Sequence, residues 1–165
     1  MNGRVGDGMS IREFEKEDIK PLAEIVRATG VFREDEIDVA VELMNIAAND
    51  KEQKDYFLFS YVDEAGTVQG YYCAGPTPMT QRTFDLYWIA VHPRVHKKRI
   101  GHELLEHCEE HVKTLGGKLL VVETSSQPKY EQTRRFYLRH QYVEAARIKD
   151  YYAQDDDLVI YSKYF

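Results

Sequence analysis

The stretch AVHPRVHKKRIGHELLEHCEE, residues 90–110, joins an apolar run to an amphipathic helix through a short basic turn. The apolar run ends at Pro93, and four of the six residues after it are Lys or Arg. Apolar residues then recur at helical spacing, which predicts a helix over about residues 99–115. The densest positive charge of an acidic chain therefore lies where a helix begins.

The runs on either side of this helix predict two neighbouring strands. TFDLYWIAVHP, residues 83–93, is apolar on both faces near its end, which is typical of a central strand that is covered from both sides. Gly116 and Gly117 end the helix, and KLLVVETSS, residues 118–126, predicts another buried strand. A strand, a helix and a strand in this order form a right-handed parallel crossover.

The remainder of the chain predicts further strands and helices around this crossover. They are a strand at 9–15, helices at 18–30 and 33–50, a hairpin at 56–76 that turns at 64–66, a helix at 130–141, and closing strands at 142–152 and 157–165. Asp18 is the predicted N-cap of the first helix, and Gly30 is its end. We therefore predict a mixed α/β fold: a central, mostly antiparallel sheet of about seven strands with one parallel β-α-β crossover and helices on both faces.

The composition is that of one globular domain. The chain has 165 residues, of which 43% are hydrophobic and 30% are charged. The first eight residues, MNGRVGDG, lack the apolar region of a signal peptide, so we expect a flexible lead-in at 1–8 and a single domain at 9–165. No run approaches the roughly 18 apolar residues that a membrane span needs. We expect a cytoplasmic protein that does not associate with a membrane.

The charge, the cysteines and the histidines do not indicate nucleic acid, a disulfide framework or a metal. The net charge of -6 argues against a general nucleic-acid binder, so the local positive charge points to a small anion. Cys73 and Cys108 are the only cysteines, and we expect each to pack as a small apolar residue. His107 and His111 have a spacing that can bind a metal, but no third ligand is evident, and we favour a solvated helix face.

The basic turn suits a pyrophosphate. A helix N-terminus carries unpaired N–H groups and the positive end of the helix dipole. Four cations precede that end: Arg94, Lys97, Lys98 and Arg99. Gly101 leaves room for close approach of a ligand. The alternative is a solvated turn on an acidic protein, but the turn follows the carboxyl end of a central strand, where ligands of α/β folds tend to bind.

The segment WIAVHPRVHKKRIGHELL resembles the acyl-CoA signature of the GNAT-superfamily N-acetyltransferases. Downstream, VVETSS resembles the next strand of that family, and TRRFYLRHQYVEAA resembles its A-x-x-F-Y-x-x-x-G-F segment, with His140-Gln141-Tyr142 where Gly-Phe is usual. The resemblance covers nearly the whole chain in element order and residues 84–146 in motif detail. It implies the acyl-CoA N-acyltransferase fold and acetyl-CoA as the co-substrate.

The resemblance also implies which residues hold the cofactor. The phosphates would be held at Arg94, His96, Lys97, Lys98, Arg99, Ile100, Gly101 and His102, and the pantetheine arm would pair with Ile89, Ala90 and Val91. In this alignment His96 takes the place of a Gln or Arg, and Arg99 takes the place of a glycine. If Arg99 adopts the backbone that glycine normally allows, its N–H still donates and its side chain adds charge; if it does not, cofactor binding is impaired.

Glu123 is the candidate base that removes a proton from the attacking amine. It interrupts the apolar strand 118–126 near its carboxyl end, and because a buried unpaired carboxylate is costly, it either faces a cleft or is hydrogen-bonded. Burial would raise its pKa towards a useful value. The alternative is a structural carboxylate bonded to Thr124, Ser125 or a Tyr. Asp85 on the neighbouring strand is the rival base, farther from the expected thioester.

Tyr137 is the candidate acid that protonates the departing thiolate, because it occupies the position where the family commonly has a tyrosine near the sulfur. An ordinary Tyr pKa of about 10 keeps this proton in place at neutral pH. The alternative is a core aromatic residue, since Tyr130, Thr133 and Tyr137 share one helix face.

Together these residues predict direct transfer of an acetyl group from acetyl-CoA to a primary amine of a small molecule or of a protein or peptide, by a monomer or homodimer that needs no metal. Acidic and Tyr-rich segments such as KDYYAQDDD suit a cationic acceptor, although acidic surfaces also keep proteins soluble. Two other functions stay open: a non-catalytic acyl-CoA-binding or sensing module with an altered pyrophosphate loop, and an interaction protein whose basic turn meets an acidic partner.

Overall fold

The computed structural model describes residues 3–4 and 10–165. The chain divides into two compact units. Unit 1 comprises the described residues up to Gly75 together with Trp88–His111, and unit 2 comprises Pro76–Tyr87 and Val112–Phe165. Of the predicted lead-in at 1–8, Gly3–Arg4 form a short strand, and the other residues lie outside the described part of the chain.

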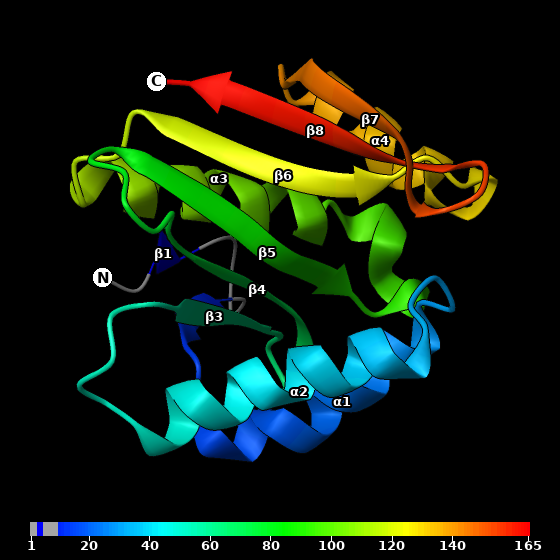
Figure 1. Cartoon of the computed structure of the whole chain (residues 1–165). Helices are drawn as coiled ribbons and strands as arrows, with labels where there is room; N and C mark the ends of the chain where they lie inside the picture. The colour runs from blue at the N-terminus through cyan, green and yellow to red at the C-terminus, as the bar shows by residue number, and fades with distance from the viewer. Residues whose placement is uncertain (1–2, 5–9) are drawn as a thin grey trace. The chain divides into compact units, whose positions relative to one another are not determined.

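The described residues form an eight-stranded sheet in the order β1-β2-β3-β4-β5-β6-β8-β7. Within unit 2, β8 lies between β6 and β7 (Figure 1). The strands are β1 (Gly3–Arg4), β2 (Ser10–Glu13), β3 (Phe57–Val62), β4 (Val68–Pro76), β5 (Thr83–Val91), β6 (Leu119–Ser125), β7 (Val143–Ala153) and β8 (Asp156–Tyr164). β5 and β6 pair in parallel, whereas β1·β2, β2·β3, β3·β4, β6·β8 and β7·β8 pair antiparallel. The predicted sheet with one parallel crossover is confirmed, and the additional strand is the two-residue β1.

The described residues form four α-helices, each within two residues of its predicted ends. They are α1 (Ile19–Ala28), α2 (Glu34–Asn49), α3 (Ile100–Thr114) and α4 (Glu131–Arg139). Three short 3-10 turns that the sequence did not predict precede α1, α3 and α4: η1 (Lys16–Asp18), η2 (Pro93–Lys98) and η3 (Pro128–Tyr130). No helix in the described part of the chain is long and apolar enough to cross a membrane.

In unit 1, helices cover both faces of the strands. Along β3, Leu58 packs in a buried cluster with α1 and α2, while Phe59 points to the other face and packs against His107 of α3. The cluster on the α1–α2 side contains Phe14, Leu22, Ile25, Val26, Ile37, Met44, Leu58, Tyr71, Cys73 and Ala90. Cys73 and Cys108 are both free and buried, as predicted.

A partly buried ion pair joins β2 to η1, and a hydrogen bond from Ser60 connects it to β3. Asp18 precedes α1 at the predicted N-cap position, but its side chain does not cap α1 and belongs to the capping box of η1. Its carboxylate instead accepts hydrogen bonds from the Arg12 guanidinium at 2.7 and 2.9 Å, from the Ser60 hydroxyl at 2.8 Å and from the backbone N–H of Glu15 at 3.0 Å. Burial disfavours the ionised carboxylate, but these hydrogen bonds outweigh burial and lower the pKa of Asp18.

In unit 2, β6 is the central partner of two strands. It pairs with β8 from Leu119 to Ser125, but its parallel pairing with β5 extends over three residue pairs, which end where Asp85 is opposite Val121. β8 in turn pairs with β7, the last strand of the sheet.

The two predicted helix-ending glycines have different physical reasons. Gly116 follows α3 with φ +83, a left-handed conformation that favours glycine. A Cβ on Gly117 would lie 2.9 Å from Phe84 and from the carbonyl oxygen of Val112, so only glycine fits there without movement of the backbone. These two residues let the chain pass from α3 into β6 within a few residues.

We predict that Arg12→Leu lowers the free energy of unfolding by about 2–3 kcal/mol, because it leaves the carboxylate of Asp18 buried without its guanidinium partner. The value lies at or below that of fully buried ion pairs, since the Arg12 side chain is 25% exposed and the Asp18 side chain 4%. Urea unfolding followed by circular dichroism measures the change. Arg27→Leu is the matched control, because Arg27 pairs with Glu34 on the surface, and its loss is expected to stay within about 0.5 kcal/mol. Equal losses in the two variants would contradict a stabilising role for the buried pair.

Candidate active site

The basic turn η2 follows β5 in unit 1 and is held by two histidines. The Nδ1 atom of His92 accepts a hydrogen bond from the backbone N–H of Arg94 at 3.1 Å, and the His92 carbonyl accepts one from Val95 at 3.0 Å. His96 Nε2 lies 2.7 Å from the carbonyl oxygen of Val91, and because a carbonyl only accepts, Nε2 carries the proton in this arrangement. His96 therefore fixes the turn to the end of β5, a contact that the sequence did not reveal.

Arg99 joins this turn to α3 in a left-handed backbone conformation, with φ 60 and ψ 17. Glycine adopts this conformation readily, whereas other residues adopt it at a cost of about 1 kcal/mol or more. The Arg99 carbonyl accepts a hydrogen bond from the N–H of Glu103 at 3.1 Å, which closes the first turn of α3. The sequence left open whether Arg99 adopts a backbone that glycine normally allows. The structure shows that it does.

The start of α3 is electropositive. The exposed cations around it are Arg94, Lys97, Lys98 and Arg99. The first N–H groups of an α-helix lack intrahelical partners, and the helix dipole adds partial positive charge there. Ile100 is buried and anchors the helix, Gly101 adds no side chain, and His102 Nε2 lies 3.2 Å from Glu106 one turn further on. An arrangement of this kind is suited to an anion with several oxygen atoms, such as a phosphate group.

The predicted pantetheine segment is the end of β5, which lies close to β4. Ala90 and Val91 are buried, and Ile89 is half-buried. A Cβ on Gly70 of β4 would lie 2.7 Å from the carbonyl oxygen of Ala90, so a larger residue would force the two strands apart. Gly70 was not predicted from the sequence, although a glycine inside a strand is a known signal of close backbone approach.

Glu123 and Asp85 lie on the same face of unit 2. Asp85 is opposite Val121 in the parallel register, and Glu123 is two residues further along β6, so both side chains point to one side of the sheet. Partial burial and the negative charge of Asp85 raise the pKa of Glu123, although its side chain remains exposed to solvent. Asp85 accepts a hydrogen bond from the Thr77 hydroxyl at 2.7 Å, which fixes its carboxylate in this position.

The hydroxyl groups next to Glu123 are engaged elsewhere. Thr124 donates to the carbonyl oxygen of Val159 at 2.9 Å, and Ser125 donates to the carboxylate of Asp156. Two of the hydroxyl partners expected for a purely structural Glu123, Thr124 and Ser125, therefore have other partners, and a tyrosine stays the remaining alternative.

Tyr137 is buried in unit 2, with 2% of its surface exposed. Its ring stacks on Tyr161, with centroids 6.1 Å apart, and meets Tyr142 edge-on at 5.5 Å. Tyr161 is opposite Val122, so Tyr137 lies on the face of the strands that is opposite to the face of Glu123. Its ring thus packs as a core aromatic, and the role of its hydroxyl stays a prediction.

A second residue takes a left-handed backbone where the resemblance has a glycine. Gln141 follows α4 with φ 69. The next N–H, of Tyr142, donates to the carbonyl of Tyr137 at 3.1 Å and closes the end of the helix. Tyr142 stands where the family has Phe, and it is buried. Both glycine departures in the sequence motifs, at Arg99 and at Gln141, therefore keep a glycine-like backbone.

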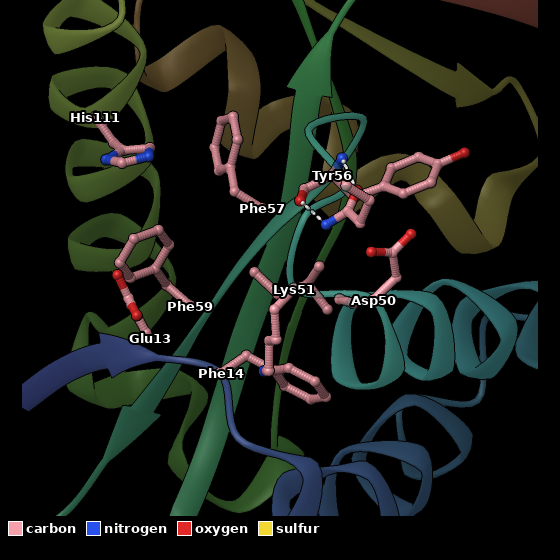
Figure 2. Close-up of a pocket in the computed structure, with 11 residues that line it drawn as sticks. Glu13, Phe14, Asp50, Lys51, Tyr56, Phe57, Phe59 and His111 are labelled. Carbon is pink, nitrogen blue, oxygen red and sulfur yellow. Dashed lines mark hydrogen bonds between the residues drawn. The ribbon is translucent and has the colours of Figure 1, made fainter.

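A cavity of about 250 Å³ lies in unit 1 beside the far end of α3 (Figure 2). It is lined by Glu13, Phe14, Ala47, Asp50, Lys51, Gln53, Tyr56, Phe57, Leu58, Phe59 and His111. His111 lies about 16 Å along the axis of α3 from Ile100, so this cavity is separate from the basic turn.

The prediction that His107 and His111 lie on a solvated helix face is wrong. His107 Nδ1 lies 2.8 Å from the Tyr72 hydroxyl, and its ring packs on Phe59 with centroids 4.6 Å apart. Burial, and then the neighbouring His111, lower the pKa of His107 to about 4. Aromatic side chains from two strands cover this helix face, which helical spacing alone does not indicate. Within residues 3–4 and 10–165, no three His, Cys, Asp or Glu side chains form a group that could hold a metal.

The sheet with one parallel crossover and an electropositive helix start define the acyl-CoA N-acyltransferase fold. Residues 20–142, most of the chain, match the model of the acetyltransferase (GNAT) family. The chain therefore belongs to the GNAT family of acetyltransferases, as its sequence motifs implied. No curated protein matches it.

Solved structures agree with this assignment. A GNAT-family protein from Desulfovibrio desulfuricans has a TM-score of 0.88 and 36% identity, over 94% of this chain and 98% of that one. YncA of Salmonella typhimurium, solved with its cofactor acetyl-CoA, has a TM-score of 0.73 and 19% identity, over 96% and 94%. The PaiA N-acetyltransferase of Thermoplasma acidophilum, solved with coenzyme A, has a TM-score of 0.73 and 19% identity, over 95% and 99%. The last two share the fold with this chain.

We predict that Arg99→Gly raises the free energy of unfolding by about 0.5–1 kcal/mol, because relief of the left-handed backbone exceeds the added entropy of glycine in the unfolded chain. Lys98→Gly removes the same charge from the adjoining 3-10 turn, where glycine brings only its entropic cost, so this control is expected to be destabilised. Urea unfolding of both variants gives the comparison. A similar destabilisation in both would mean that Arg99 does not hold a left-handed backbone.

Proposed function

We propose that this protein transfers an acetyl group from acetyl-CoA directly to a primary amine of a small molecule or of a protein or peptide. Its family gives the class of reaction. The left-handed backbone of Arg99 is the observation that carries the proposal, because this is a conformation that glycine adopts readily. The loss of the glycine therefore does not by itself argue for a module that has lost its cofactor.

The proposed cofactor site lies along residues 89–102 of unit 1. The phosphates meet the N–H groups at the start of α3 and the side chains around it, namely Arg94, Lys97, Lys98, Arg99 and His102, with Ile100 and Gly101 supplying backbone only. His96 holds the turn through Val91. The pantetheine arm pairs with the backbone of Ile89, Ala90 and Val91. The acetyl-CoA and coenzyme A in YncA and PaiA support this choice of co-substrate.

The proposed chemistry uses one base, backbone donors and one acid. Glu123 accepts a proton from the amine, directly or through a water molecule, and the nitrogen attacks the thioester carbon. Backbone N–H groups near the end of β5 stabilise the oxyanion of the tetrahedral intermediate. The C–S bond then breaks, and the thiolate takes a proton from the hydroxyl of Tyr137. The proton that the nitrogen still loses on becoming an amide returns to the Tyr137 oxygen, and Glu123 releases its proton to water. The products are the acetylated amine and coenzyme A.

The acceptor that best fits unit 2 is cationic. Asp85 and Glu123 present two carboxylates on one face, and Tyr87 is exposed beside them on β5, with its hydroxyl 3.4 Å from Asp85. An ammonium group approaching this face is attracted by both carboxylates, and the raised pKa of Glu123 suits it to take up the proton.

Binding of acetyl-CoA is the first test. We predict that acetyl-CoA raises the melting temperature, whereas acetate does not, because ligand that binds only the folded state stabilises it by mass action. Replacing Lys97 and Lys98 by Glu is expected to weaken binding at least about tenfold, and less so at high salt, since exposed charges are screened. Lys16→Glu with Lys20→Glu is the matched control, because these two lysines are exposed near the start of α1. No thermal shift at saturating acetyl-CoA would remove both the enzyme and the sensor and leave the interaction protein.

The second test follows coenzyme A release with a panel of amines over a range of pH. Because Glu123 must be ionised to accept a proton and its pKa is raised, the acid limb of kcat/KM is expected above the usual value of 4.5. Asp85→Asn removes a negative charge that raises this pKa, so the limb moves to lower pH. Glu123→Gln is expected to lower turnover by about 100-fold or more. An unchanged limb in Asp85→Asn together with full activity in Glu123→Gln would refute the assigned base.

Tyr137→Phe removes the hydroxyl and keeps the ring, so we expect lower kcat, and thermal melting shows that the variant is folded. Tyr161→Phe is its control, because this ring is also buried and stacks on Tyr137. Equal activity in both variants would refute the assigned acid. A protein that binds acetyl-CoA but releases no coenzyme A with any amine would support the sensing module instead.

A further inference from the structure

The edge strand β7 presents an unusual amount of apolar surface. It is the last strand of the sheet, and all of its residues from Val143 to Ala153 are exposed. Its large apolar side chains are exposed to 58% at Val143, 48% at Ile148, 55% at Tyr151 and 42% at Tyr152. A long exposed edge strand is a template for pairing with another strand unless its side chains prevent it.

A bulge in β7 determines which of its side chains point to each face of the sheet. Val143 and Ile148 are opposite Ser162 and Leu158, so they point to one face of the sheet. The pairing shifts between Glu144 and Ala146, which leaves Ala145 as an extra residue. In a regular strand, positions five residues apart would point to opposite faces, and the extra residue brings both apolar side chains to the same one.

The charged side chains share the other face. Glu144 is opposite Tyr161, and Arg147 is opposite Val159, two β8 residues that both point to the face of α4. One face of the segment 143–148 thus carries Val143 and Ile148 at its two ends. The other face carries Glu144 and Arg147, one residue in from each end.

We propose that β7 pairs antiparallel with β7 of a second copy of this chain, about a two-fold axis between Ala145 and Ala146. This register places Val143 opposite Ile148 of the second copy and Glu144 opposite Arg147 of the second copy. In each pair, both side chains lie on the same face of the sheet. One pair is apolar and the other joins an acid to a base. The two-fold axis makes each pair occur twice in the dimer. Opposite charges directly across neighbouring strands stabilise the pairing, whereas like charges oppose it.

Neighbouring registers lack this match. A shift of one residue on each strand places Ala146 opposite Arg147, which point to different faces, and a shift the other way places Arg147 opposite Tyr142 and leaves no ion pair. Edge charges normally block association of copies, but here the acid and the base lie where a symmetric copy brings their opposites.

The bond that Arg147 already makes does not prevent the interaction. Its Nε donates to Asp157 at 2.7 Å, and a guanidinium has five N–H donors, so others can reach Glu144 of the second copy. Because one short strand segment buries a small area, we expect a dimer that forms and dissociates with concentration, not an obligate one.

Sedimentation velocity over a range of protein concentrations tests the proposal with two charge reversals. Glu144→Arg and Arg147→Glu each replace both attractive pairs by repulsive ones, so each is expected to weaken the dimer at least about tenfold. Mixing the two variants restores attraction at both pairs of the heterodimer, so the mixture is expected to dimerise as the wild type does. The double variant, which exchanges the two charges within one chain, is expected to dimerise as well.

Matched controls come from α4 in the same unit. Glu131→Arg and Arg135→Glu change the same charges at an exposed pair within one chain, and both are expected to leave the dimer unchanged. Asp157→Ala removes the acceptor of Arg147 and separates loss of that contact from loss of the edge pairing; it is expected to keep the dimer affinity within about twofold. Thermal melting shows that each variant is folded. A wild type that stays monomeric at all concentrations, or a mixture of folded Glu144→Arg and Arg147→Glu that does not dimerise, would overturn the proposal.

Discussion

The left-handed backbone of Arg99 is the constraint on which the arrangement of unit 1 depends. The chain leaves β5 at Val91, passes through a right-handed 3-10 turn and begins α3 at Ile100. A right-handed residue at position 99 would continue the turn into the helix, and the first N–H groups of α3 would then bond to carbonyls of the turn. The left-handed residue interrupts this path, and α3 then runs back across the strands, where His107 meets Phe59.

The same sequence patterns predicted the elements and missed the contacts between them. Hydrophobic periodicity, together with the glycines that end α1 and α3, placed each α-helix of the described residues within two residues, because both are local properties of the chain. Asp18 also has the local signature of an N-cap, yet its carboxylate bonds to Ser60, 42 residues away, and to Arg12. His107 likewise has a polar local context, and its environment is set by Phe59 and Tyr72 on strands far away in the sequence. A local pattern identifies a residue type that suits a position; the tertiary neighbours decide how that residue is used.

In the candidate site, too, the local features could be predicted and the tertiary contacts could not. Residues 89–102 could be predicted as a unit because they are contiguous, and the structure places them in one strand end, one turn and one helix start. The environment of Glu123 could not be predicted, because it depends on Asp85 and therefore on the register of two parallel strands. The burial of Tyr137 and its position on the opposite face depend on a further register, that of β6 with β8. The bulge at Ala145 has the same origin, since alanines carry no signal for an extra residue in a strand.

The two departures from glycine show how a motif can change its letters and keep its geometry. Arg99 and Gln141 have φ of 60 and 69, so the backbone at both positions is left-handed, a conformation that glycine adopts readily. Each costs about 1 kcal/mol of strain, and each persists because its surroundings fix it: α3 begins directly after Arg99 with the buried Ile100, and the buried Tyr142 follows Gln141. At Arg99 the replacement also adds a positive charge beside the helix start. The sequence departure therefore predicts a cost in stability and a stronger local field, and it does not by itself predict a blocked site.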